Sequence, residues 1–401
     1  MWNFDYIACM KKKQLIVSMI MLVIIISFQT FTFALDANRK FVNVADIHFD
    51  PLASCSISLH ACPLAAQLIK LPYQMWEDIL LSYDDQSQNV HYYHDTNYSL
   101  LKVTFNEIKR LDQKERFEFA VVLGDILAHR FRTEYILYSH DYTQAGYQNF
   151  VRKIFQFIAM KFQQTLPSQS IYFAVGNNDT YDADYTVKEN GIFLQQTAIT
   201  WSKLILDKEN RNLFLQSFHQ SGYYSVNLSP KYRLIVLNSV LFSAEINDMQ
   251  SKVLALSQLD WLHQELMKSK LEHQKVLLAF HIPVGINVVG TLKNYLNGVQ
   301  EFWQPTYTTI FNDNIKEYAS IISAILPAHI HREELQLGML SQPSTVNTFI
   351  TPSISPIFGN NPSFKVFSYD VQNYQLTDTE TYYYRLDKSL KACFWEKRVY
   401  L

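Results

Sequence analysis

The sequence has almost no net charge, few cysteines and no internal repeat. Lys and Arg total 35 against 37 Asp and Glu, and the formal net charge of −2 excludes the broad basic face of a nucleic-acid-binding protein. Only four cysteines occur in 401 residues, so disulfides cannot be the main scaffold. The lack of repeats and low-complexity tracts excludes a repeat array. We therefore expect an ordinary globular protein that does not bind nucleic acid.

Apolar and aromatic side chains are what the sequence has in quantity. Hydrophobic residues make up 48% of the chain and aromatic residues 14%, which is enough for a large core and excludes wholesale disorder. The 25 Tyr and 27 Phe exceed what a core usually needs, so some lie on the surface, line a pocket or touch lipid. A chain of 401 residues has room for one large domain or two smaller ones.

The N-terminus has the three-part plan of a secretory signal. Lys11 to Lys13 precede an apolar stretch from Leu15 to Phe28, and Thr32 to Ala34 offer small residues at the spacing of a cleavage site. We predict a signal peptide over residues 1–34 and a secreted or periplasmic protein. An uncleaved membrane anchor is the weaker alternative, because a bilayer span needs about 20 apolar residues.

Two cysteines, Cys55 and Cys62, flank a short loop. An oxidising compartment would allow them to form a disulfide, and this is the interpretation we favour. The alternative is a pair of buried free thiols.

Short β-branched runs alternate with longer amphipathic stretches, which predicts an α/β fold in which helices flank a layered core of β-sheet. The expected strands are 41–47, 119–123, 171–175, 232–237, 275–280, 321–326 and 364–369. The expected helices are 99–111, 148–165, 191–218 and 257–270. The run 321–326 also has the pattern of a helix end. Residues 52–97 and 285–307 have the pattern of irregular insertions, such as the walls of a cleft. We expect one catalytic domain over residues 35–350, and a C-terminal extension over 351–401 that packs on it.

Side chains that bind metals end five of the apolar runs. These segments are Val44-Ala45-Asp46-Ile47-His48, Leu123-Gly124-Asp125, Val175-Gly176-Asn177-Asn178-Asp179, Ala279-Phe280-His281 and Ala328-His329-Ile330-His331. Any one of them alone is a weak signal, because a single histidine or Gly-Asp pair is usually structural. The ordered set predicts a site for two divalent cations, which can together cleave a phosphate ester.

The spacing within two segments supports this prediction. Asp46 and His48 are two residues apart in an extended run, as are His329 and His331, so each pair can face one common volume. Asp125 follows a glycine that allows a sharp turn, and its two carboxylate oxygens could bridge two cations.

The order and spacing of these segments resemble the calcineurin-like metallophosphoesterases. Within that superfamily the chain resembles acid sphingomyelinase and the acid-sphingomyelinase-like phosphodiesterases. The narrower resemblance rests on four stretches: Asp46 to Pro51, Gly124 to His129, Gln258 to Leu262 and Ser355 to Phe364. It spans about Phe41 to Asp370. So few residues lie between the signal and Asp46 that we expect no saposin-like domain, as in the shorter members of the family.

The resemblance implies a role for each ligand. One metal would be bound by Asp46, His48 and His331. The other would be bound by Asn177, His281 and His329, and Asp125 would bridge the two. The metals of the animal enzymes are zinc, and this ligand set suits zinc, with manganese and iron as alternatives.

The resemblance also implies that His129, in the position of the family's histidine after the second motif, donates a proton to the leaving group. Many members have Gly-Asn-His in the third motif, whereas this chain has Asn178 there. An asparagine can hydrogen-bond a phosphate oxygen but is no useful proton donor. Proton donation would then come from His129, or from Asp179 if its pKa is raised. Ala328 replaces a glycine usually found before the last motif, which should tighten the turn without breaking the site.

The resulting functional prediction is a secreted dinuclear-metal phosphodiesterase. Its substrate would be a small phosphodiester, a nucleotide or a phospholipid headgroup, with transient membrane contact in the last case. An endopolyphosphatase or nucleotide phosphohydrolase on the same site is one alternative, since a phosphate leaving group needs less protonation than an alkoxide. A catalytically weak secreted binding protein is another.

Overall fold

The computed structural model describes residues 38–55, 62–83, 90–294, 296, 298–338, 346–386 and 395–400. The expected signal peptide, residues 1–34, lies outside these ranges. Within them, no helix combines the length and the apolar character needed to cross a bilayer.

Two six-stranded sheets form the centre of the molecule. The first contains, in spatial order, β12 (Trp395–Tyr400), β11 (Leu376–Tyr384), β10 (Ser363–Asp370), β1 (Asn38–Val44), β2 (Phe119–Val122) and β3 (Ser170–Phe173). Strands β1, β2 and β3 are parallel, and β10 is antiparallel to β1 with Phe41 opposite Phe367. The second contains β4 (Tyr224–Ser229), β5 (Tyr232–Val236), β6 (Lys275–Ala279), β7 (Ile322–Leu326), β9 (Thr348–Ile350) and β8 (Glu334–Gln336). Strands β5, β6, β7 and β9 are parallel.

The second sheet is buried on both faces. Leu234, Leu277 and Leu326 belong to the core that it shares with the first sheet. The intervening residues Ile235 and Leu278 belong to a second core with the helices on the other side. Because side chains alternate along a strand, this division means that the second sheet lies between the first sheet and a helical layer.

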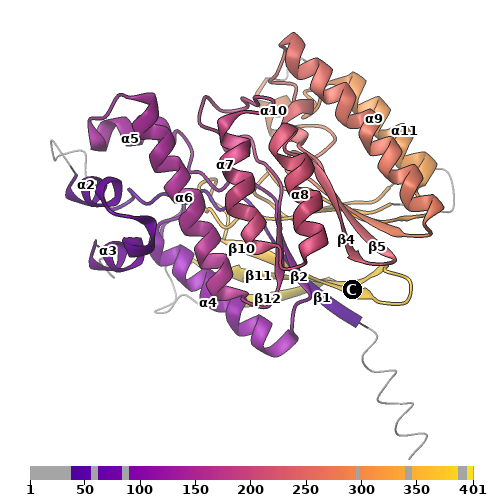
Figure 1. Cartoon of the computed structure of the whole chain (residues 1–401), viewed down its shortest axis with the longest axis horizontal. Coiled ribbons are helices and arrows are strands. Elements are labelled where there is room, and N and C mark those ends of the chain that lie inside the picture. Colours follow the sequence, from indigo (N-terminus) through magenta and orange to yellow (C-terminus); the bar gives the residue numbers. More distant parts are fainter. Residues whose placement is uncertain are drawn as a thin grey trace, which may run out of the picture.

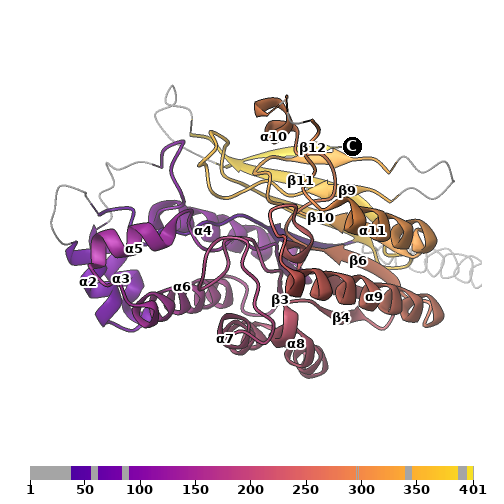
Figure 2. The same cartoon turned by 90° about the horizontal axis from the view of Figure 1, so that it is seen from above.

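Helices cover the outer faces of both sheets, as Figures 1 and 2 show. Beside the first sheet lie α4 (Tyr98–Glu115), α6 (Gln144–Thr165), α7 (Ile192–Trp201) and α8 (Lys208–Ser221). Beside the second lie α9 (Met249–Leu271) and α11 (Pro305–Tyr318). The predicted fold class, a layered α/β sandwich, is confirmed.

Several element boundaries differ from the sequence-based expectation. The helix expected over 191–218 is two helices, separated by η2 (Ser202–Leu204) and an extended residue, Ile205. The second helix, α8, begins at Lys208 because the Asp207 side chain accepts a hydrogen bond from the backbone N–H of Asn210 and so caps its N-terminus. The expected irregular insertion 52–97 contains α2 (Pro63–Lys70), η1 (Tyr73–Met75) and α3 (Trp76–Tyr83). The insertion 285–307 is mostly irregular, with the short helix α10 (Val288–Lys293).

The C-terminal part is built into the first sheet. Strands β10, β11 and β12, all within the expected extension 351–401, make up half of that sheet, and β10 is hydrogen-bonded to β1. The remaining short helix, α5 (Phe131–Ser139), follows the second ligand segment. Cys55 and Cys62 form the expected disulfide.

Candidate metal centre

All seven sequence-predicted ligands come together between the two sheets. They lie on the loops after five strands, β1, β2, β3, β6 and β7. The carboxyl ends of neighbouring parallel strands meet at one edge of a sheet, and packing two sheets face to face brings both sets of loops into one volume. The ligands are Asp46, His48, Asp125, Asn177, His281, His329 and His331.

The first group of ligand atoms surrounds Asp46. His331 Nε2 lies 3.4 Å from Asp46 Oδ1, and His48 Nε2 lies 3.8 Å from the same oxygen. His48 Nε2 is also 3.4 Å from Asp125 Oδ2. The other ring nitrogen of His48 lies 2.9 Å from the backbone oxygen of Leu127, which leaves Nε2 for the centre.

The second group surrounds His281. Its Nε2 lies 3.0 Å from Asn177 Oδ1, 3.2 Å from Asp125 Oδ2 and 3.3 Å from His329 Nδ1. Its Nδ1 lies 2.6 Å from the backbone oxygen of Leu123. Asp125 Oδ2 therefore lies between the two groups, which is where a bridging ligand would have to be.

These separations suit divalent cations. A tetrahedral ion with bonds of about 2.1 Å has ligand atoms about 3.4 Å apart. Asp46 Oδ1 and His48 Nε2 are buried and have no hydrogen-bond partner among the described residues. Buried polar atoms left without a partner are costly, and here they converge on one point. The residues thus fit two divalent cations.

Five of the seven ligands have a left-handed backbone conformation rather than that of a strand. The φ angles are +48° at Asp46, +43° at His48, +54° at Asp125, +71° at His329 and +57° at His331. The expectation that each i, i+2 pair lies in an extended run is therefore wrong. Strand β1 ends at Val44, before the ligands. Non-glycine residues in this conformation cost free energy and are concentrated at functional sites.

Two glycines allow the loops after β2 and β3 to touch. A Cβ on Gly176 would lie 2.1 Å from Asp125 Oδ1, and a Cβ on Gly124 would lie 2.4 Å from Gly176 N. Gly124 also has a φ of +85°. Any side chain at Gly176 would displace the bridging carboxylate.

Asp179 fastens the same two loops together. Its carboxylate accepts hydrogen bonds from the backbone N–H groups of Asp125, Ile126 and Gly176, at 2.8, 2.8 and 2.9 Å, with a longer one from Leu127 at 3.4 Å. The side chain is buried and does not line the cavity over the metal ligands. Burial raises the pKa of Asp179 to about 6, and the charge of Asp125 adds to the shift. With its oxygens occupied by the backbone, Asp179 does not face a leaving group.

The carboxylates of Asp46 and Asp125 favour positive charge at the metal centre. Burial by itself would lower the pKa of His48 and His281, but Asp46 and Asp125 outweigh it and raise both to about 9. In contrast, burial lowers the pKa of His329 to about 4 and of His331 to about 3. Burial thus favours the neutral form of His329 and His331, whereas the two carboxylates favour positive charge next to His48 and His281, where a cation would lie.

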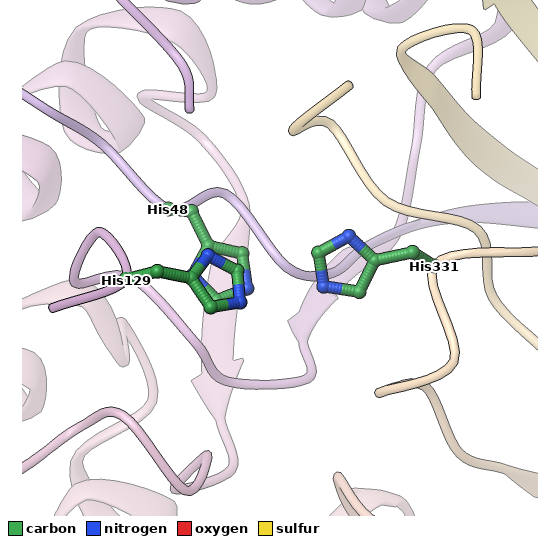
Figure 3. Close-up of side chains that lie close together, drawn as sticks. All are labelled: His48, His129 and His331. Atoms are coloured by element: carbon green, nitrogen blue, oxygen red, sulfur yellow. The ribbon is translucent and has the colours of Figure 1, made fainter. Parts of the chain in front are cut away.

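His129 stands at the edge of the centre. Its ring stacks on that of His48 with centroids 3.9 Å apart, and Figure 3 shows both facing His331. One nitrogen from each of these three rings lies within 4.8 Å of the others. His129 Nδ1 is 3.1 Å from the Asp95 carboxylate, which also accepts His129 N–H at 2.8 Å and the Ser355 hydroxyl at 2.8 Å. Asp95 thereby directs the other ring nitrogen, Nε2, towards the metal ligands.

A cavity of about 710 Å³ opens over the ligands. Its floor includes Asp125, Asn177 and His331, while Val288 and Phe302 of the 285–307 segment belong to an apolar wall. The insertion expected to form a wall of the cleft does so.

The sequence is similar to known phosphodiesterases over most of its length. Sphingomyelinase phosphodiesterase D of Dictyostelium discoideum is 25% identical over 381 residues, which cover 92% of this chain and 78% of that protein. The human cyclic GMP-AMP phosphodiesterase SMPDL3A is 26% identical over 236 residues, or 57% of this chain and 49% of that protein. The chain is thus similar in sequence to acid sphingomyelinase-like phosphodiesterases.

No family model matches the chain. Among solved structures, a dimetal phosphatase from Danio rerio aligns with a TM-score of 0.42 and 11% identity, over 86% of this chain and 95% of that one. The matched region is about half of the human relative's length.

The chain departs at Asn178 from the usual third motif of the family it resembles, and the structure shows where that side chain lies. Asn178 Nδ2 donates to Asp125 Oδ2 at 2.8 Å, and its backbone N–H donates to Asp125 Oδ1 at 2.8 Å. Asn178 lines the cavity, but its amide is committed to holding the carboxylate between the two groups. Ala328, the other departure, is buried and is absent from the residues with positive φ, so its methyl group causes no backbone strain.

Two residues that support the site were missed in the sequence. Asp95 orients His129, and Asp184 Oδ1 accepts a 2.8 Å hydrogen bond from Asn177 Nδ2, so that the oxygen of Asn177 faces His281. Neither follows an apolar run. The only sequence signal for Asp184 was its place seven residues after a ligand, and Asp95 had none beyond lying in an insertion beside a ligand segment.

Proposed function

We propose that this protein hydrolyses phosphodiesters at the centre formed by the seven ligands. The observation that carries the proposal is the position of Asp125 Oδ2, within 3.4 Å of His48 on one side and 3.2 Å of His281 on the other. When bound, two adjacent divalent cations supply an activated water and neutralise charge on the phosphoryl oxygens.

The ligand assignment follows the two groups of atoms. Asp46, His48 and His331 would hold one cation, and Asn177, His281 and His329 the other, with Asp125 shared. Five nitrogen and amide ligands with two carboxylates suit zinc, and the same donors accept manganese or iron. Asn178 and Asp179 would act on Asp125 by holding it and its loop in place.

The proton for the leaving group would come from His129. The ring nitrogen that faces the centre can donate to an oxygen on the substrate, while Asp95 retains the other nitrogen. Burial opposes ionisation of Asp95, but the hydrogen bonds of His129 and the charge of His48 lower its pKa to about 2. The carboxylate is therefore ionised at neutral pH, and it would stabilise the protonated ring before the proton leaves.

Hydrolysis of bis-p-nitrophenyl phosphate with zinc or manganese tests the function directly. The wild type should release nitrophenol, whereas Asp125→Ala should be inactive because the two groups lose their common ligand. Asp260→Ala provides a matched control, since Asp260 is exposed on α9, where it accepts a hydrogen bond from Gln264. Equal rates of hydrolysis by the wild type and Asp125→Ala would contradict the proposal.

A second candidate function is cleavage of phosphoanhydrides, favoured by the commitment of Asn178 to Asp125. If only His129 can donate a proton, substrates whose leaving group needs none would be cleaved well. Parallel assays with ATP, polyphosphate and sphingomyelin separate this alternative from phosphodiester hydrolysis. A protein that holds less than one metal per chain after loading with zinc would instead be a binding protein.

We also propose that residues 1–34 are a signal peptide and that the protein is secreted or periplasmic. The Cys55–Cys62 disulfide supports an oxidising compartment. Expression with and without residues 1–34, followed by fractionation, tests this: only the full chain should leave the cytoplasm and lose the segment.

Transient membrane contact is supported by exposed apolar side chains of the 285–307 segment, part of which lines the cavity. Ile286, Val288, Leu292 and Leu296 are all more than half exposed, beside the exposed Lys293. An apolar patch with a cation at its edge is typical of surfaces that touch lipid. Flotation with anionic vesicles should recover the wild type, and Leu292→Ser with Leu296→Ser should weaken that recovery.

A further inference from the structure

A buried lysine of the first sheet is paired with a glutamate that follows the last metal ligand. Lys365 lies in β10 and is only 2% exposed, and its ammonium group forms an ion pair with the carboxylate of Glu333. Lys365 Nζ also donates to Thr381 Oγ1 at 2.9 Å, and the Thr381 hydroxyl donates to Glu333 at 2.5 Å. A lysine is almost never buried to this extent unless its charge is paired. Lys365 and Thr381 therefore hold Glu333 in one place.

The Lys365–Glu333 pair joins the two sheets where the first group of ligands also joins them. Glu333 lies two residues after His331, on the loop between β7 and β8 of the second sheet. Lys365 lies in the first sheet, opposite Asn43 near the end of β1. The first cation would take Asp46 from the loop after β1 and His331 from the loop after β7. The ion pair thus spans the same gap between the sheets as this cation would.

The second ring nitrogen of His331 has no hydrogen-bond partner in the described part of the chain, although it is buried. In contrast, His48 and His281 each place Nδ1 near a backbone oxygen, at 2.9 and 2.6 Å. Such a contact of the second nitrogen normally fixes the direction of a ligating imidazole. The ring of His331 also meets Phe358 edge to face, but that side chain is 65% exposed and gives little restraint. The direction of His331 Nε2 therefore depends on where the backbone of its loop is held.

The backbone of this loop needs to be held on both sides of His331. Its φ of +57° is unfavourable for a residue with a Cβ and persists only where the surroundings restrain it. Before His331, the backbone N–H of His329 donates to Asp46 Oδ2 at 3.1 Å. After it, Glu333 is held by Lys365 on the first sheet, whereas β8 pairs with β9 within the second sheet. Glu333 thus fixes the far side of the loop relative to the first sheet.

We propose that Lys365, acting through Glu333, is a positioning residue that keeps His331 directed at the cation it would share with Asp46 and His48. The inference rests on the ligand assignment of the proposed function. Loss of the ion pair would free the loop to move away from the first sheet and weaken binding of this cation. The second cation would be affected less, because His329 has its own hydrogen bond to Asp46. The C-terminal strands would then serve the metal centre without providing a ligand.

Zinc titrations of two variants that each retain one cation site test the inference without turnover. In His329→Ala the remaining site is that of the first group, and adding Lys365→Met should weaken its zinc affinity about 10–100-fold, as for other partners behind a ligand. In His331→Ala the remaining site is that of the second group, and adding Lys365→Met should leave its affinity unchanged. Equal weakening in both backgrounds, or none in His329→Ala, would overturn the inference.

Replacing the whole ion pair separates positioning from stability. Lys365→Met leaves Glu333 without its charged partner, whereas Lys365→Met with Glu333→Leu leaves no unpaired charge and should recover part of the lost stability. Zinc affinity of the first site should stay low in the double variant, because an apolar contact does not direct the loop. Recovery of zinc affinity together with stability would contradict a positioning role.

A second buried lysine provides the matched control. Lys161 of α6 is paired with Glu77 of α3 at 2.9 Å and contacts no metal ligand. Lys161→Met should lower the free energy of unfolding but leave zinc affinity unchanged in both single-site backgrounds. A loss of zinc affinity as large as in Lys365→Met would mean that any buried lysine has this effect, and would overturn the inference.

The zinc content of the wild type distinguishes failure of the inference from failure of the proposed function. Two zinc ions per chain, with unchanged affinity in Lys365→Met, would overturn the inference and leave the proposed function standing. Fewer than two zinc ions in the wild type would overturn the ligand assignment and the inference with it.

Discussion

The two sheets contribute unequal halves to the metal centre. The loops after β1, β2 and β3 provide both carboxylates, an amide oxygen and one imidazole, whereas the loops after β6 and β7 provide three imidazoles. On the first side, Asp125 is fixed by two hydrogen bonds from Asn178, and its loop by Asp179. On the second side, His281 is directed by one backbone oxygen. The bridging carboxylate is thus held by several hydrogen bonds, whereas the imidazole of His281 is oriented by a single one.

Replacing a ligand on the first side should have the largest effect. Asp125→Asn removes the shared charge, and we expect kcat/KM for bis-p-nitrophenyl phosphate to fall at least about a thousandfold, since even partners behind a ligand contribute 10–100-fold. Elemental analysis should find fewer than one metal per chain. Asp260→Asn is the control. Two retained metals would mean that the charge of Asp125 is not what holds them.

Replacing a ligand on the second side should cost less. His281→Asn retains a neutral donor, so we expect a loss of about a hundredfold that excess zinc partly restores. Activity measured against zinc concentration checks this. Equal losses of activity in His281→Asn and Asp125→Asn at saturating zinc would mean that the ligands of the two sides contribute equally.

The hydrogen bonds that fix the loops after β2 and β3 can be tested at Asp179. Asp179→Asn brings an amide NH₂ towards backbone N–H donors, so some of these buried groups lose their acceptor. We expect a loss of about 3 kcal/mol in the free energy of unfolding, measured with urea. Asp184→Asn, which faces the cavity and accepts from Asn177, should cost less stability. A stable Asp179→Asn protein would show that the loops hold their left-handed form unaided.

The dyad of Asp95 and His129 connects the first side to proton transfer. In Asp95→Asn the ring loses its charged partner, and we expect kcat to fall about 10–100-fold with little change in KM. The loss should be smaller for a substrate with nitrophenol as leaving group than for one with an alkyl alcohol, because nitrophenolate needs no proton. A uniform loss on both substrates would point to a structural role.

The smallest expected effect concerns the pH dependence of stability at Glu134, on α5. The folded-state pKa of Glu134, about 7, exceeds its ordinary value of 4.5, so the folded protein binds the extra proton and stability falls as pH rises from about 4.5 to 7. Glu134→Gln cannot lose that proton. We expect it to be more stable than wild type by about 1 kcal/mol at pH 8, with the gap closing near pH 4.5, after discounting for partial exposure. Thermal unfolding at both pH values checks the sign, and a constant gap would contradict it.

Ligand identity was readable in the sequence because each ligand directly follows an apolar strand. A run such as Phe119 to Leu123 can only be buried, and a Gly-Asp at its end must emerge at the edge of the sheet. The same reasoning identified strands β1, β2, β3, β5, β6 and β7 and the layered fold. The ligands and the strands could both be predicted because each depends on the pattern of apolar and polar residues over a few neighbouring positions.

The conformation of the ligands was not readable. Asp46 and His48 read as alternating residues of a strand, yet both are left-handed, because contacts between loops from different strands override local preference. Asp95 could not be found, since its partner lies 34 residues away and helix α4 intervenes. The break before α8 was hidden by apolar periodicity that continues across Asp207. Strand β10 was expected over 364–369, but its place in the first sheet was not readable because its partner β1 is the first strand of the chain, and β11 and β12, which extend the sheet from β10, were missed.

That last pairing has a consequence for biosynthesis. Strand β1 bonds on one side to β2 and on the other to β10, more than 300 residues later. Until residues 363–370 have left the ribosome, the edge of β1 that later pairs with β10 offers unpaired backbone N–H and C=O groups. The other edge of β1 is paired with β2, whose four residues are all apolar. The nascent chain must keep that edge from other strands while the rest of the protein folds, and pairing across so long a separation is slow. A chain truncated after residue 350 would retain all seven ligands and still leave that edge open to aggregation.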